Sequence, residues 1–182
     1  MSTFENAIPT VLRNEGGYVN NPNDFGGCTN FGISTRFLLS HPEIGITDAK
    51  LLTVEQAEAI YEQYWWEFYK YGNVVDQTIA TKILDLSVNM GANAIHSIVQ
   101  LILNRDFWFK LTVDGNLGPL SFAAINSVNT LTTQQTLITT MSDQVWAHYQ
   151  AIIAAHPEDQ QFAVGWKNRA YNINKAGSIP SS

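Results

Sequence analysis

Two carboxylic acids and a hydroxyl residue lie close together near the start of the chain, in a segment rich in glycine. Glu15 is followed by Gly16 and Gly17, and the polar stretch after them carries Asp24 and Thr29. A protonated carboxyl can act as a general acid, while a second carboxyl in a wetter setting stays ionised. Glycosidases divide acid and base roles between two such groups. The segment is therefore a candidate for acid–base catalysis.

The helix predicted before this segment determines the surroundings of Glu15. Ile8, Val11 and Leu12 recur at helical spacing, and Glu15 continues their apolar stripe. Burial on such a stripe disfavours the charged form of a carboxyl, so we expect Glu15 to be the proton donor. A simpler alternative stays open, in which Glu15 is an ordinary helix end before Gly-Gly and Asp24 is a turn residue.

The ordered string that starts at Glu15 reads Glu-Gly-Gly-Tyr-Val-Asn, then Pro and Asp, then Gly-Gly-Cys-Thr-Asn-Phe-Gly-Ile. It closely resembles the signature of glycoside hydrolase family 108, whose members are N-acetylmuramidases that cut peptidoglycan. The resemblance makes Glu15 the catalytic acid, Asp24 a second carboxylate that stabilises positive charge or holds water, and Thr29 a hydroxyl that positions water or substrate. Tyr18 and Asn30 in the same string are predicted to contact the substrate.

The reaction implied by this resemblance is hydrolysis of the β-1,4 bond between N-acetylmuramic acid and N-acetylglucosamine. No cofactor and no metal are implied, and the binding partner is the glycan strand of peptidoglycan. Two alternatives stay open. A lytic transglycosylase would use the same Glu15, and a non-catalytic peptidoglycan-binding protein would hold the wall without cutting it.

Two later segments add candidate binding residues. In an aromatic cluster, Tyr61, Trp65 and Phe68 share one helical face and are predicted core residues, whereas Tyr64 is a candidate to line a sugar-binding cleft. The string Asp-Leu-Ser-Val-Asn-Met-Gly, which ends at Gly91, looks like a second block of the family. It implies that its asparagine, Asn89, binds an acetamido group; a buried asparagine that satisfies local backbone is an equal alternative.

The second half of the chain carries a resemblance of its own. The block Val-Asp-Gly-Asn-Leu-Gly-Pro from Val113 to Pro119 resembles small predicted peptidoglycan-binding modules. The string Gly-Trp-Lys-Asn-Arg at 165–169 matches the end of the module usually fused to these muramidases. Trp166 is accordingly predicted to contact the substrate.

Helical periodicity and turn residues predict a mainly α, lysozyme-like fold with a small irregular hairpin or loop after the first helix. Capping-box patterns at Ser2 and Thr53 predict two helix starts, and Ser34 a third. Further helices are expected over about 76–90, 94–103, 133–155 and 159–172. We predict a catalytic region over 1–91, a helical peptidoglycan-binding region over 92–176 packed with it as one lobe, and a loose tail over 177–182.

Composition limits the remaining possibilities. With 10 basic and 16 acidic residues the net charge is −6, which argues against nucleic acid and anionic membranes as partners. Cys28 has no cysteine partner, and four scattered histidines lack zinc-like spacing. The first residues do not resemble a Sec-type signal peptide, and no apolar run is long enough to insert into a membrane. We expect a monomer, made in the bacterial cytoplasm, that reaches the periplasm or wall through a holin pore or a specialised export route.

Overall fold

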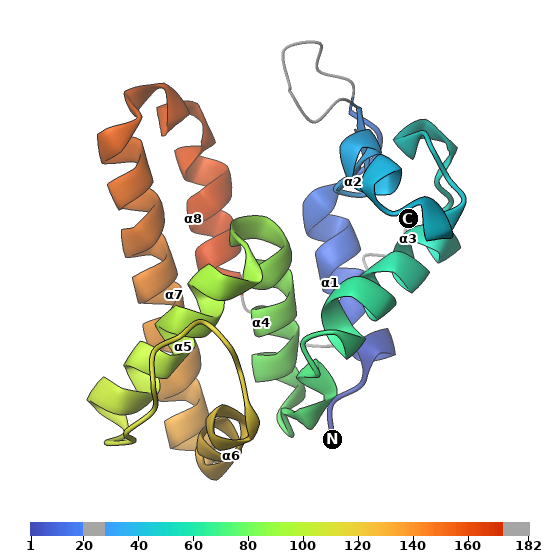
Figure 1. Ribbon diagram of the computed structural model, residues 1–182. Coiled ribbons are helices and arrows are strands. Elements are labelled where there is room, and N and C mark those ends of the chain that lie inside the picture. Colours follow the sequence, from blue (N-terminus) through green and yellow to red (C-terminus); the bar gives the residue numbers. More distant parts are fainter. Residues whose placement is uncertain (20–27, 173–182) are drawn as a thin grey trace, which may run out of the picture.

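A computed structural model describes residues 1–19 and 28–172 of the chain, and most of them are helical (Figure 1). The α-helices are α1 (Phe4–Glu15), α2 (Thr35–Ser40), α3 (Val54–Tyr61), α4 (Gln77–Met90), α5 (Ala92–Asp106), α6 (Pro119–Ser127), α7 (Leu131–Ala155) and α8 (Ala163–Tyr171). Short 3-10 turns are η1 (Pro42–Ile44), η2 (Ala49–Leu51), η4 (Tyr71–Asn73) and η5 (Pro157–Phe162), and η3 (Glu62–Glu67) is a π-helical turn. The strands β1 (Thr29–Asn30) and β2 (Ile33–Ser34) complete the described part, so the predicted mainly α fold with a small hairpin is confirmed.

Helix α4 lies at the centre of the molecule (Figure 1). Helix α1 packs against it from the first half of the chain, and α5 packs against it from the second half. The consecutive residues 79–87 of α4 are all buried, as expected for a helix covered on every side. Helix α7 in turn packs against α5 and α8. A common core therefore connects elements from both halves of the chain.

The start of α1 differs from the predicted capping box. Thr3 is the N-cap residue and makes no side-chain cap bond, whereas the Ser2 hydroxyl donates to the carbonyl oxygen of Val74 at 2.7 Å. The Ser2 hydroxyl thus satisfies a backbone acceptor just before α4 instead of capping its own helix. The predicted apolar stripe is present: Ile8 and Val11 are buried, and Leu12 is partly buried against the core.

The hairpin β1–β2 follows α1 and turns tightly. Asn30 pairs with Ile33 across the strands, and the two turn residues between them, Phe31 and Gly32, have φ of 51° and 78°. A two-residue turn with positive φ at both positions matches the twist of antiparallel strands. The Tyr61 hydroxyl donates to the Phe31 carbonyl oxygen at 2.7 Å, which fixes the turn against α3.

Other helix ends show which local signals are reliable. The capping box at Thr53 and the Ser34 cap of α2 are both present. Helix α8 begins at Ala163 rather than near 159, because residues 157–162 form the 3-10 turn η5 after Pro157. In the described part of the chain, no helix has both the length and the apolar character needed to cross a membrane.

A buried lysine connects α4 to the end of α8. Lys82 is 6% exposed, and its Nζ donates to the carbonyl oxygen of Ala170 at 2.6 Å. Burial lowers the pKa of Lys82 from 10.5 to about 8, although the charge of Asp85 opposes the shift. Between these two values the unfolded chain holds more protons on this group than the folded chain does. The Lys82 contribution to the free energy of unfolding must therefore rise with pH in that range.

We expect Lys82→Met to remove this pH dependence. At neutral pH the wild type carries a buried ammonium, while the variant avoids its desolvation and loses one hydrogen bond. Denaturant unfolding of both proteins between about pH 7 and pH 11 measures the difference in unfolding free energy. The free energy of unfolding of the wild type should increase relative to that of the variant as pH rises from about 8. For the exposed Lys50→Met control, the difference in unfolding free energy from wild type should not change with pH. The same independence of pH for Lys82→Met would contradict the expectation.

Candidate active site

Glu15 is the last residue of α1, and other elements cover most of its side chain. The side chain is 16% exposed, and its Oε1 accepts a hydrogen bond from Nη2 of Arg169 at 2.6 Å. Arg169 belongs to α8 in the second half of the chain. The predicted apolar stripe accounts for the burial of Glu15, but the sequence did not predict its guanidinium partner.

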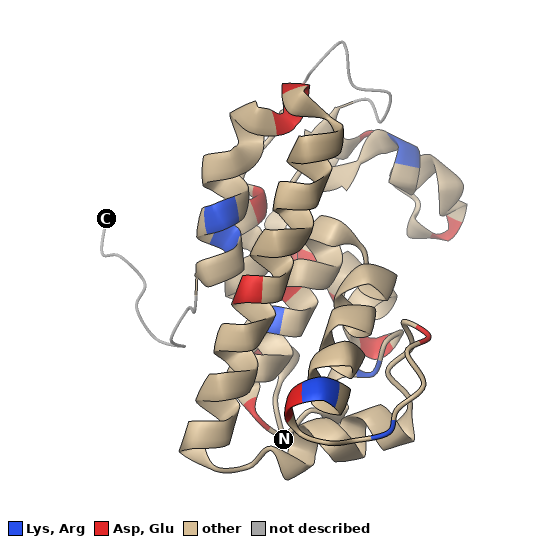
Figure 2. Cartoon of the chain, turned by 90° about the vertical axis from the view of Figure 1, so that its left-hand side faces the viewer, with Lys and Arg blue, Asp and Glu red and all other residues tan. Residues whose placement is uncertain are grey.

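Arg169 joins Glu15 to a second buried carboxylate. Its Nη2 also donates to Oδ1 of Asp85 at 2.9 Å and to the Asp85 carbonyl oxygen at 3.0 Å, and Asn14 donates to the same Oδ1 at 2.9 Å. Burial alone would lower the pKa of Arg169, but the charges of Asp85 and Glu15 hold it above its usual value. Helices α1, α4 and α8 thus meet at one ion cluster, defined here as Glu15, Asp85 and Arg169. Figure 2 shows most of the described ribbon in tan, so residues other than Lys, Arg, Asp and Glu make up most of the helices.

The hairpin turn lies against the other side of Glu15. A Cβ built on Gly32 would come within 2.5 Å of Glu15 Oε2 and 2.7 Å of the Tyr61 hydroxyl oxygen. Glycine is therefore required here by both close approach and positive φ. Burial, followed by the charge of Glu15, raises the pKa of Tyr61, which keeps its phenol protonated as a hydrogen-bond donor.

The other residues of the predicted catalytic string differ in their location and burial. Asp24 lies outside the described residues. Thr29 is in β1, where its backbone pairs with Val19. Tyr18 is 45% exposed just before this pair, and Asn30 is buried with its amide donating to the Leu52 carbonyl oxygen at 3.3 Å. The roles of these residues toward a substrate stay predictions.

Asn89 and Trp166 are brought together by a residue that the sequence analysis did not single out. The Tyr149 hydroxyl donates to Asn89 Oδ1, and the Tyr149 ring stacks on Trp166 with centroids 5.0 Å apart. Burial raises the pKa of Tyr149 to about 12, with smaller effects from Arg169, Asp85 and Glu15. Tyr149 therefore connects two predicted binding residues to the surroundings of the ion cluster.

Tyr64 lines a groove of about 410 Å³ between the aromatic cluster and the junction of α4 and α5. Its hydroxyl donates to Glu43 at 2.6 Å, and its ring meets those of Phe37 and His41 edge-on. The predicted core face is only partly confirmed: Tyr61 is buried, but Phe68 is 70% exposed. The residues of the groove are Phe37, His41, Tyr64, Trp65, Phe68, Tyr69, Ser87, Val88, Gly91 and Ala92.

The exposure of Phe68 has a structural cause. The prediction assumed 3.6 residues per turn from Tyr61 onward, but residues 62–67 form the π-helical turn η3. Its wider i→i+5 hydrogen bonding rotates every later side chain relative to the α-helical face. Phe68 is thereby rotated away from the core, which leaves its ring available at the groove.

The ion cluster itself could not be read from local patterns. Asp85 and Arg169 belong to the strings 85–91 and 165–169, but the spacing of these strings does not indicate a contact with Glu15, which is 154 positions from Arg169. Over residues 1–19 and 28–172, no three His, Cys, Asp or Glu side chains are grouped so that they could hold a metal ion.

Comparison with known proteins identifies the family to which the fold and the glycine-rich string are similar. Residues 8–91 match the family model of glycosyl hydrolase 108, and residues 93–171 match the predicted peptidoglycan domain. The chain is similar to the solved structure of Brucella abortus SagA, at 26% sequence identity and a TM-score of 0.70, over 92% of this chain and 88% of that one. No curated protein matches the chain.

The two matched regions are consecutive and cover nearly all of the described residues. The structural similarity also spans both of them, and the fold is lysozyme-like. The chain therefore belongs to the glycosyl hydrolase 108 family, as a glycosidase that acts on peptidoglycan and carries a predicted peptidoglycan domain in its second half.

Proposed function

We propose that this protein is an N-acetylmuramidase that hydrolyses the β-1,4 bond between N-acetylmuramic acid and N-acetylglucosamine, with Glu15 as the general acid. The observation that supports this most is the enclosure of Glu15. Its carboxyl lies between the buried Arg169 guanidinium and the glycine turn of the hairpin, with 16% of the side chain open to solvent. A shielded carboxyl next to a turn without side-chain bulk can reach the leaving oxygen of a bound sugar.

Within the ion cluster, Arg169 is bonded mainly to Asp85. Arg169 makes one hydrogen bond to Glu15 but three to Asp85, through Nε and Nη2. Asp85 therefore neutralises the guanidinium independently of Glu15. Glu15 then donates its proton to the glycosidic oxygen as the C–O bond breaks, and water adds to the oxocarbenium-like centre. We assign Asp24 to stabilising that centre or holding the water, and Thr29 to positioning it.

Aromatic rings connect Glu15 to the groove and suggest a path for the glycan. Tyr61, next to Glu15, contacts Trp65 with ring centroids 5.2 Å apart, and Trp65 lies 5.6 Å from Phe37 in the groove. Aromatic faces stack on the apolar faces of sugars, so we propose that Tyr64 and its neighbours hold sugar rings. Tyr18 at the hairpin, and Asn89 with Trp166 beside Tyr149, complete the proposed contacts. Asn30 supports them by anchoring the hairpin to Leu52.

Within this proposal, residues 1–91 are the catalytic region and residues 92–176 the peptidoglycan-binding region, packed together as one lobe. The predicted tail at 177–182 lies outside the described residues. Arg169 of the second region reaches Glu15 of the first, so one chain completes the ion cluster and we propose a monomer. Action is at the cell wall, reached through a holin pore or a specialised export route, as in phage lysis or in muramidase-assisted secretion.

Mass spectrometry of sacculi digested with the purified protein tests this function. A muramidase releases fragments that end in reducing N-acetylmuramic acid. Fragments ending in 1,6-anhydro-muramic acid would instead identify a lytic transglycosylase. Binding to sacculi without any released sugar would identify a non-catalytic wall-binding protein, and either result would overturn the proposal.

A further inference from the structure

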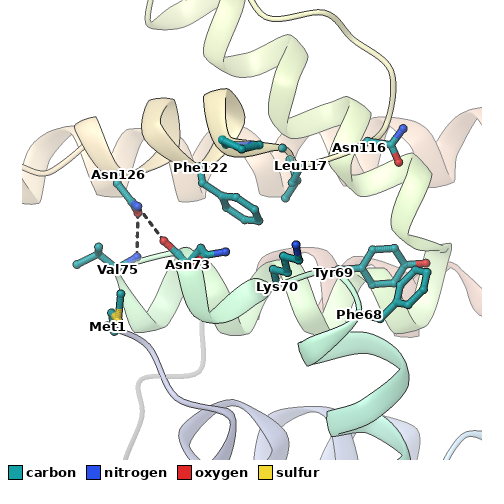
Figure 3. A pocket seen from close by; sticks show the side chains of 12 residues that line it. Met1, Phe68, Tyr69, Lys70, Asn73, Val75, Asn116, Leu117, Phe122 and Asn126 are labelled. Atoms are coloured by element: carbon teal, nitrogen blue, oxygen red, sulfur yellow. Dashed lines mark hydrogen bonds between the residues drawn. The ribbon is translucent and has the colours of Figure 1, made fainter.

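A second cavity, which none of the ion-cluster residues lines, lies between the two halves of the chain (Figure 3). It encloses about 670 Å³. The first half contributes the segment around η3 and η4, and the second half contributes the loop before α6 and α6 itself. Its lining residues are Met1, Phe68, Tyr69, Lys70, Asn73, Val75, Asn116, Leu117, Gly118, Pro119, Phe122 and Asn126.

The cavity has a positively charged side chain in its wall, although the chain as a whole has a net charge of −6. Lys70 is the one charged side chain among the described residues that line it. Within the described part of the chain, Lys70 forms no ion pair. Figure 3 shows its nitrogen pointing across the cavity toward Leu117 and Phe122. A cation beside apolar walls, without a neighbouring carboxylate, suits a ligand that combines a carboxylate with small apolar groups.

The backbone at Lys70 supports a role for its side chain. Lys70 has φ of 58°, in the left-handed region that glycine adopts more easily. A non-glycine residue there is uncommon and carries strain, and strained backbone clusters at functional sites. Among residues 1–19 and 28–172, no carboxylate forms an ion pair with Lys70. Its ammonium can therefore pair with a ligand.

The two walls of the cavity are held at a fixed separation. The Asn126 side chain donates to the Asn73 carbonyl oxygen at 2.8 Å and accepts from the Val75 amide at 2.8 Å. These two bonds join α6 to the last residue of η4 and to the segment that follows it (Figure 3). The cavity is thus formed in advance, which lowers the entropic cost of binding a ligand.

The cavity also adjoins the aromatic groove assigned to the glycan. Phe68 and Tyr69 line both spaces. In peptidoglycan, a short peptide branches from each muramic acid and carries free carboxylates and alanine methyl groups. A glycan strand in the groove could therefore extend such a peptide past Phe68 to Lys70.

We propose that this cavity binds the stem peptide of peptidoglycan, with Lys70 pairing with a peptide carboxylate and the apolar walls contacting alanine side chains. The inference rests on the proposed muramidase function, because the groove is assigned to the glycan strand. It adds a substrate requirement: the enzyme prefers glycan that carries peptides over bare glycan.

Binding of a free stem tetrapeptide, without any sugar, tests the site directly. We expect calorimetry to detect binding to the wild type, and about 10-fold to 100-fold weaker binding to Lys70→Gln, which loses a charge-assisted hydrogen bond. Lys70→Gly relieves the left-handed strain, so it should unfold at a higher temperature and still lose peptide affinity. The exposed Lys110→Gln control should bind as wild type does. Equal binding by all four proteins, or binding of N-acetylglucosamine oligomers but not of peptide, would overturn the assignment.

A second comparison separates this inference from the proposed function. Peptide-bearing glycan and glycan stripped of peptides by an amidase are digested side by side. The rate ratio should favour the peptide-bearing strands for wild type and Lys110→Gln, and should fall toward one for Lys70→Gln. A wild-type ratio of one would refute the peptide site while leaving the muramidase assignment in place. Digestion of neither substrate would refute the muramidase function. Calorimetry would then show by itself whether the cavity binds the peptide.

Discussion

Replacing Glu15 with glutamine should lower the release of reducing sugar from sacculi by about 10²-fold to 10⁴-fold, the usual range for loss of a general acid. Glutamine has nearly the size of glutamate, and its amide oxygen can still accept a hydrogen bond from Arg169. Asp85 continues to neutralise the guanidinium. The variant should therefore fold and bind sacculi, because the change removes only the proton that Glu15 would donate.

The matched control is Glu5→Gln, an exposed position in the first turn of the same helix. It should retain wild-type activity. Reducing-end assays, circular dichroism and co-sedimentation with sacculi measure activity, fold and binding for the three proteins. Near-normal lysis by purified Glu15→Gln would show that another residue supplies the proton.

Gly32→Ala should also reduce activity strongly, although it adds only one methyl group. The new Cβ would come within 2.7 Å of the Glu15 Cγ and of the Tyr61 hydroxyl oxygen, closer than such atoms can approach. The Glu15 carboxyl and the Tyr61 hydroxyl must therefore move. A displacement of about 1 Å in a reacting group can cost about 10²-fold in rate. The positive φ of 78° adds about 1–2 kcal/mol of backbone strain, so unfolding should also become easier.

A substitution at a second glycine distinguishes the effect of displacing Glu15 from the effect of backbone strain. Gly45 has a similar φ of 73°, but a Cβ there meets nothing within 4 Å. Gly45→Ala should lose stability and keep its activity per folded molecule. Activity and denaturant unfolding measured on both variants make the comparison. If both lose activity equally, the hairpin turn does not position Glu15.

Local sequence signals predicted this chain well wherever a short segment decides its own conformation. The caps at Ser34 and Thr53 are examples, since the side chain and the amide that it accepts from are three residues apart. The capping box at Ser2 was wrong because the hydroxyl bonds instead to Val74, a partner 72 residues away. The face assigned to Phe68 was wrong because periodicity cannot reveal the π-helical turn before it.

The candidate site divides in the same way. The sequence alone determined three features of the site, because they are properties of residues close together along the chain. These are the glycine-rich string, its resemblance to a family and the position of Glu15 on an apolar stripe. The partners of Glu15 come from α8, from the hairpin turn and, through Arg169, from α4. Their approach depends on how α4 packs between the two halves, and helix packing is decided by contacts between distant residues.

The cavity around Lys70 was likewise invisible to sequence analysis, because its walls come from segments about 50 residues apart that meet through Asn126 and Val75. From its sequence the chain could be recognised as a helical glycosidase that acts on peptidoglycan, and Glu15 could be predicted as its acid. Only the tertiary structure showed that Arg169 joins Glu15 to Asp85, and that the cavity around Lys70 adjoins the groove. Charges and hydrogen-bond partners act over a few ångströms of space, whatever their separation along the chain.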